Sequence, residues 1–100
     1  MGEATPRVRA IVKSDTRPTM PAHIKLRHDA GRGRWLILAP ERVFEPDDVA
    51  VEILKLCDGQ RSVGDIAGML AKEYNAPLDE ISADVIAMLQ DLADKGVVKA

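Results

Sequence analysis

The chain has 100 residues, of which 46% are hydrophobic and only three are aromatic, so it has the size of one domain with an aliphatic core. Its single cysteine excludes an internal disulfide, and it contains neither an apolar run long enough to span a bilayer nor an apolar N-terminal signal segment. Residues 1–34 hold eight Lys or Arg and three Asp or Glu, a net of +5, whereas residues 35–100 hold six and thirteen, a net of −7. We therefore expect a cytoplasmic protein whose larger part is acidic.

The first 21 residues differ in composition from the rest. They contain three prolines, scattered charges and one short apolar alternation at 8–12, with no turn or partner segment beside it. This composition predicts that residues 1–21 form a disordered tail or linker in front of a domain at 22–100. A docked or swapped strand at 8–12 is the alternative.

Three short segments then have the patterns of β-strands. Residues 22–27 alternate apolar and polar side chains, which predicts a half-buried strand. Residues 34–39 are apolar at both parities, which predicts a central strand covered on both faces. Residues 42–45 form a third, very short strand that Pro46 ends, because proline cannot donate a hydrogen bond to a ladder.

From residue 47 onward the apolar spacing becomes three or four, which predicts three helices. The first begins at Asp47 or Asp48 and ends at Gly59, the second begins at the capping-box-like Ser62–Asp65 and ends at 75–77, and the third covers 78–95. Their predicted apolar faces hold Val49, Ile53, Leu54 and Cys57; Ile66, Ala67, Leu70, Ala71 and Tyr74; and Leu78, Ile81, Val85, Met88, Leu89 and Leu92. Val97 and Val98 form a closing strand or simply pack.

This order of elements predicts an α+β, winged-helix-like domain, in which a three-stranded antiparallel sheet is followed by a three-helix bundle. The second and third helices resemble a helix-turn-helix pair, whose second member enters the DNA major groove. Here that helix, 78–95, carries five acidic residues and one basic residue, which would repel phosphates. A DNA-binding regulator is therefore the competing hypothesis, and the charge of this helix opposes it.

The residue types that carry catalysis or bind metals are sparse. Cys57 lies on the predicted apolar face of the first helix, where a buried structural thiol is expected. His23 and His28 flank a strand and a turn, without the spacing of a metal site. We therefore predict no catalytic residue, no metal site and no cofactor, and a binding protein in place of an enzyme.

The third predicted strand offers an open sheet edge. It is short, has Val43 and Phe44 at its centre, and is predicted to lie beside an apolar helix. A peptide could add there as a further strand, with backbone hydrogen bonds for affinity and side-chain pockets for selectivity. The alternative, that Phe44 and the third helix only complete the core, is equally compatible with the residues.

One run of residues carries a family resemblance. The stretch Lys25–Asp29 followed by Arg34–Arg42, with Trp-Leu-x-Leu-Ala-Pro-Glu-Arg at its centre, resembles the signature of the pyrroloquinoline quinone (PQQ) biosynthesis protein D (PqqD) family. Residues 53–59 and 84–96 continue the similarity, which covers about 22–99. Residues 1–21 lie outside it and resemble the linker of a fusion to the oxidase that completes the pathway (PqqC-like), or a natural extension.

The resemblance implies a function. Members of the family are precursor-peptide recognition elements that bind the ribosomal precursor of PQQ (PqqA-like). They present it to a radical S-adenosylmethionine enzyme (PqqE-like), which cross-links a Glu and a Tyr of the precursor. The peptide is held along the third strand and third helix, and the corresponding residues here are Arg42, Val43, Phe44, Glu45, Asp84, Val85, Met88 and Leu89.

Overall fold

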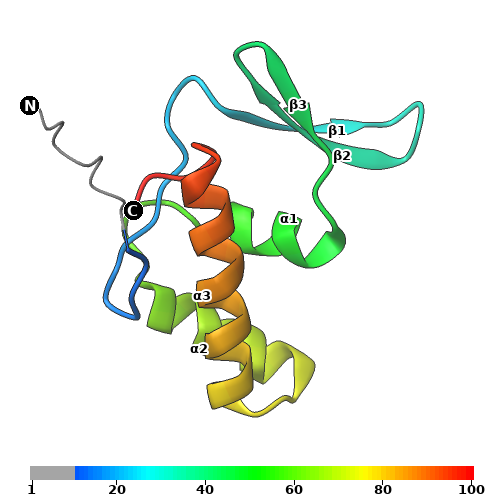
Figure 1. Ribbon diagram of the computed structural model, residues 1–100. Helices are drawn as coiled ribbons and strands as arrows, with labels where there is room; N and C mark the ends of the chain where they lie inside the picture. Colours follow the sequence, from blue (N-terminus) through cyan, green and yellow to red (C-terminus); the bar gives the residue numbers. More distant parts are fainter. Residues whose placement is uncertain (1–10) are drawn as a thin grey trace, which may run out of the picture.

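The computed structural model describes residues 11–100 as a small sheet followed by three helices (Figure 1). Strands β1 (Lys25–Asp29), β2 (Arg34–Ala39) and β3 (Arg42–Phe44) form an antiparallel sheet in the order β1-β2-β3. Helices α1 (Asp48–Lys55), α2 (Val63–Tyr74) and α3 (Leu78–Asp94) follow. The predicted fold class is confirmed, although β1 begins at Lys25, three residues later than the pattern indicated.

The strand register gives the sheet two unlike faces. Ile37 and Phe44 are register partners on the face that packs toward the helices, and Ile37 is only 1% exposed. Leu38 and Val43 are partners on the opposite face, where Val43 is 64% exposed. β2 is the central strand, as predicted, but the predicted cover on both of its faces is wrong. Leu36 and Leu38 stay partly exposed. The β1–β2 hairpin projects away from the helices (Figure 1).

The helix boundaries follow from side-chain caps. Asp47 is the N-cap of α1, and its Oδ1 accepts a hydrogen bond of 2.8 Å from an amide in the first turn. The predicted capping box at α2 is confirmed, because Ser62 and Asp65 each accept a backbone N–H from the other. α1 ends at Lys55, earlier than predicted, and Gly59 adopts its positive φ of 78° in the turn that follows.

Residues 11–21 are packed against the helices, which corrects the predicted tail over this part of its length. Val12 is 4% exposed, and its amide donates to Gln90 Oε1 at 2.9 Å. The carbonyls of Ser14 and Thr16 accept the amides of Gly64 and Val63 at 2.8 Å. The physical reason is that the first N–H groups of a helix have no partner within the helix, and this segment supplies acceptors for α2.

The same segment also joins the two ends of the described chain. Thr19 forms an antiparallel bridge with Lys99, with N–H···O distances of 3.0 and 2.7 Å. This bridge closes the domain beside Val97 and Val98, which are both buried. The alternative prediction of a strand at 8–12 lies largely outside the described residues.

The core lies mainly between the three helices. It is aliphatic, as the composition predicted, and its buried members are Val12, Ile24, Ile37, Ile53, Leu54, Cys57, Val63, Ile66, Ala67, Leu70, Val85, Leu89, Leu92, Val97 and Val98. The sheet thus lies at one end of a helical unit, and β3 connects directly into α1 (Figure 1).

Candidate functional site

A groove of about 290 Å³ separates β3 from α3, and we call it the strand groove. Phe44 and Glu45 line it from the strand side, and Met88, Asp91 and Lys95 line it from α3. The remaining lining residues are Ile37, Pro46, Asp47, Ala50 and Leu92. Its floor is apolar and its rim is charged. Protein interfaces commonly have an apolar centre and a polar rim, and a peptide that adds as a strand presents alternate side chains to such a surface.

The charged side chains at the rim are paired within the chain. Glu45 Oε1 lies 2.9 Å from Arg34 Nη1, and Asp91 Oδ2 lies 2.9 Å from Lys95 Nζ. The Arg42 guanidinium lies over the Phe44 ring, 4.7 Å from its centroid. These exposed contacts are weak, so a ligand can rearrange them at a small free-energy cost.

The edge of β3 beside this groove is open. β3 pairs with β2 on one side, and no strand among residues 11–100 pairs with its other side. An unpaired strand edge presents N–H and C=O groups that can accept a further strand. With only three residues in β3, the edge is too short to be a strong aggregation template.

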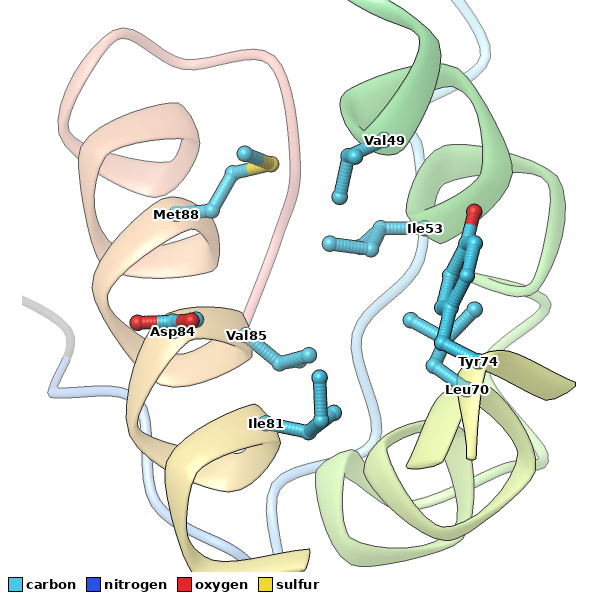
Figure 2. Close-up of a pocket in the computed structure, with 8 residues that line it drawn as sticks. All are labelled: Val49, Ile53, Leu70, Tyr74, Ile81, Asp84, Val85 and Met88. Atoms are coloured by element: carbon cyan, nitrogen blue, oxygen red, sulfur yellow. The ribbon is translucent and has the colours of Figure 1, made fainter. Parts of the chain in front are cut away.

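A second hollow, of about 220 Å³, lies between the three helices, and we call it the helical pocket (Figure 2). Side chains from α1, α2 and α3 converge on it, and Figure 2 shows Ile81, Val85 and Met88 facing Val49, Ile53, Leu70 and Tyr74 across the gap. Asp84 completes the lining. Met88 lines both hollows, so the helical pocket and the strand groove adjoin on α3.

The residues that the sequence predicted for peptide binding are distributed unevenly over these features. Phe44 and Glu45 line the strand groove, and Met88 lines both hollows. Asp84 and Val85 line only the helical pocket. Arg42 and Val43 belong to the open strand, where the Val43 side chain lies on the sheet face away from the helices.

Leu89 does not belong to either hollow. Its side chain has no exposed surface and forms part of the core. The helical stripe identified Leu89 and Met88 together, but adjacent positions on a helix point about 100° apart, so only one of them reaches the groove. We therefore omit Leu89 from the proposed site.

Three residues of the predicted apolar helix faces are exposed in the structure. Val49, Tyr74 and Leu78 were predicted on apolar helix faces, yet they are 44%, 47% and 56% exposed. Val49 and Tyr74 line the helical pocket. An apolar stripe indicates which face of a helix turns toward its neighbours, but it does not tell whether the neighbours close over every residue.

Groups with catalytic potential are few in the described part of the chain. Burial raises the pKa of Cys57 to about 12, the Asp58 carboxylate adds to the rise, and the thiol donates to the Ile53 carbonyl at 3.2 Å. No group of three or more His, Cys, Asp or Glu residues within 11–100 is placed to hold a metal ion. His28 instead packs against Trp35, with ring centroids 5.0 Å apart.

The exposed surface of α3 is acidic, as the sequence indicated. Asp79, Glu80, Asp84, Asp91 and Asp94 are all exposed. Phosphate contacts in DNA complexes are made by Lys and Arg, so this helix is unsuited to a DNA groove. Among the described helices, none has the length and apolar character required to cross a membrane.

Comparison with known proteins identifies relatives over most of the chain. A protein named PqqA binding protein from Rhodopseudomonas palustris (strain HaA2) is 65% identical over 85 residues, covering 85% of this chain and 83% of the relative. A protein of the same name from Bradyrhizobium diazoefficiens is 59% identical over 85 residues, covering 85% of this chain and 82% of the relative.

Two solved structures share the fold. The solution NMR structure of the PqqD truncation of Methylobacterium extorquens PqqCD, described as a functional, stand-alone recognition element for ribosomally synthesized and post-translationally modified peptides, has a TM-score of 0.76 and 42% identity. It covers 92% of this chain and 97% of its own. The crystal structure of PqqD from Xanthomonas campestris has a TM-score of 0.57 and 38% identity, covering 89% of this chain and 99% of its own. The family described as coenzyme PQQ synthesis protein D matches residues 34–98, and with this match and these relatives the chain belongs to the PqqD family.

Proposed function

We propose that this protein binds the ribosomal precursor peptide of PQQ (PqqA-like) by strand addition to β3. It then presents the peptide to a radical S-adenosylmethionine enzyme (PqqE-like) that cross-links a Glu and a Tyr. The single observation that carries the proposal is the open edge of β3 beside an apolar-floored groove. The relatives named PqqA binding protein, and the related recognition element, support the choice of peptide.

The proposed contacts divide into backbone and side-chain roles. Arg42, Val43 and Phe44 of β3, with Glu45 directly after it, supply the backbone N–H and C=O groups that pair with the peptide. Phe44 and Met88 form the apolar floor on which alternate peptide side chains rest. Asp84 and Val85 extend the contact along α3 into the helical pocket.

In this function the protein itself holds no reacting group and needs no cofactor. The chemistry belongs to the partner enzyme, and the role of this chain is to raise the local concentration of the precursor and to fix its extended conformation. We place this activity in the cytoplasm, with an association to a PqqC-like oxidase as in the related PqqCD. The peptide interface would bury roughly 1,200 Å² or less in total.

The binding step is tested by titrating isotope-labelled protein with the precursor peptide. We expect backbone amide signals of residues 42–45 and 81–92 to shift, while signals in the β1–β2 turn stay in place. We further expect Phe44→Asp to weaken binding more than tenfold, because it puts a carboxylate on the groove floor. Leu36→Asp is the matched control: Leu36 is also partly exposed on the sheet, but it lies on the outer face opposite Arg27.

Melting curves of both variants separate loss of binding from loss of folding. Equal losses of stability and affinity in Phe44→Asp would show that Phe44 is a core residue only. Delivery is tested by the yield of cross-linked precursor from the radical enzyme with and without the native chain. If the yield of cross-linked precursor does not depend on this chain, the proposed delivery step is wrong, whereas the proposed binding step is unaffected.

A further inference from the structure

The helical pocket leaves apolar surface exposed that the fold itself does not need. Its deep residues Ile53 and Leu70 are 1% and 2% exposed, but Val49 and Tyr74 at its mouth are 44% and 47% exposed. In Figure 2 both mouth residues border the same opening, from α1 and α2 respectively. Large apolar side chains gathered around one hollow, with a buried floor, are typical of a ligand site.

The size of the pocket suits one bulky side chain. Its volume is about 220 Å³. An engineered protein cavity of about 150 Å³ with an aliphatic and aromatic lining accepts benzene, so a Leu, Met, Phe or Trp side chain fits here. A whole peptide strand requires more room, so the pocket holds an anchor and the backbone of the ligand stays outside.

The mouth of the pocket is negative. Among the described residues that line it, only Asp84 is charged. The Tyr74 hydroxyl donates to Glu52 Oε2 at 2.6 Å, and Glu73 and Asp48 act electrostatically on the same hydroxyl. The hydrogen bond to Glu52, followed by desolvation and these three carboxylates, raises the pKa of Tyr74 to about 12. Apolar walls and a carboxylate rim favour an apolar group that has a cation next to it.

The pocket is also continuous with the strand groove. Met88 borders both, and the pocket lining on α3 spans one side of the helix from Ile81 to Met88. A strand advances about 3.3 Å per residue, so a peptide paired with β3 needs only a few further residues to reach the pocket. This adjacency favours a segment of the same peptide over an unrelated molecule.

We propose that the helical pocket is a second peptide subsite, which takes one bulky apolar side chain flanked by Lys or Arg from the peptide that pairs with β3. This inference rests on the proposed function, and it deepens it by naming the chemistry of the anchoring residue. Backbone pairing with β3 discriminates little between peptide sequences, because every peptide has the same backbone groups. The pocket would supply selectivity for the precursor.

The test compares Val49→Gln with Met69→Gln in the full chain. Val49 and Met69 are exposed helical residues, at 44% and 45%, but only Val49 lines the helical pocket. With the precursor peptide as probe, we expect Val49→Gln to raise the dissociation constant at least fivefold and Met69→Gln to change it less than twofold. At saturating peptide, the amide signals of 42–45 should still shift in Val49→Gln.

A peptide scan identifies the anchor. Each bulky apolar residue of the precursor is replaced by Ala, and each peptide is titrated against native protein and Val49→Gln. One replacement should weaken binding to the native protein yet have little further effect on Val49→Gln, because both changes remove the same contact. Asp84→Asn should weaken binding at low salt, and this effect should disappear at high salt. Glu80 is exposed on the same helix, and Glu80→Gln should not weaken binding at either salt concentration.

The outcomes separate the two proposals. If the β3 signals shift but no peptide residue couples to Val49, the second subsite is wrong and strand addition stands. If Val49→Gln changes only self-association of the peptide-free protein in sedimentation, the pocket is an interface between copies, and the subsite is again wrong. A native chain that does not bind the precursor overturns both proposals.

Discussion

The sheet and the helical unit differ in how much of themselves they bury. Ile37 is the single buried residue in the three strands, whereas each helix buries three or more. One face of the sheet leaves Leu36, Leu38 and Val43 at least partly exposed, and the β1–β2 hairpin extends away from the helices (Figure 1). The helices, with residues 11–21 and the C-terminal valines, contain most of the core.

This difference is compatible with the strand addition that we propose. A strand can accept a partner only if its edge stays unpaired, and an edge deep in a core would be covered. We therefore expect the helical unit to provide most of the stability, with the sheet packed against it through one face. Substitutions in the two regions test this difference in stability, from the largest expected effect to the smallest.

The largest effect is expected for Leu89→Ala on α3. Leu89 has no exposed surface, so its truncation should lower the free energy of unfolding by about 2–5 kcal/mol. Leu38→Ala, on the outer face of the sheet, should change it by no more than about 1 kcal/mol. Urea denaturation measures both. Similar losses for the two variants would show that the sheet is as important to stability as the helices.

A second prediction concerns the N-terminal segment, which we assign to the helical unit. Val12→Ala should destabilise the protein by about 1–3 kcal/mol, because Val12 is 4% exposed within the core cluster. Its neighbour Ile11 is 55% exposed, so Ile11→Ala should have almost no effect. The same denaturation experiment decides. An unchanged urea midpoint in Val12→Ala would show that residues 11–21 do not contribute to stability, as expected of the predicted tail.

The smallest effect is expected at the junction of the two regions. Lys55 Nζ of α1 lies 4.5 Å from the centroid of the Trp35 ring on β2. Lys55→Gln should cost about 0.5–1 kcal/mol and alter Trp35 fluorescence. Lys72→Gln is the matched control, because Lys72 occupies the last turn of α2 as Lys55 does that of α1. Identical spectra of the two variants would show that the contact does not hold the sheet to the helices.

Much of the fold could be predicted because the signals are local. Strand alternation, the Asp47 cap, the Ser62–Asp65 capping box and the break at Asn75 each act within a few residues, and all of them are present in the structure. The open edge of β3 was also predictable, since a meander of three strands has two edges. The packing of residues 11–21 was missed, because its hydrogen-bond partners Val63, Gly64 and Lys99 are distant in the sequence.

The candidate site was predictable only in part. Phe44 and Met88 were identified with the strand and the helix that bear them, and both line the strand groove. Leu89 was included because an apolar helical stripe does not distinguish a residue buried in the core, such as Leu89, from a neighbour that lines the groove, such as Met88. Val49 and Tyr74 were predicted only to lie on apolar helix faces, because no sequence signal distinguishes a covered apolar residue from one at the mouth of a pocket.

The sequence by itself determined the order of the elements, their caps, the aliphatic character of the core and the acidic surface of α3, because these depend on residue type and short-range spacing. It also carried the resemblance to the PqqD family through the Trp35–Arg42 run. Only the tertiary structure decided that Met88 borders two adjoining hollows and that Leu89 borders neither. The spacing between packed helices is set by all of their side chains together, so the openings between them cannot be inferred from any single stripe.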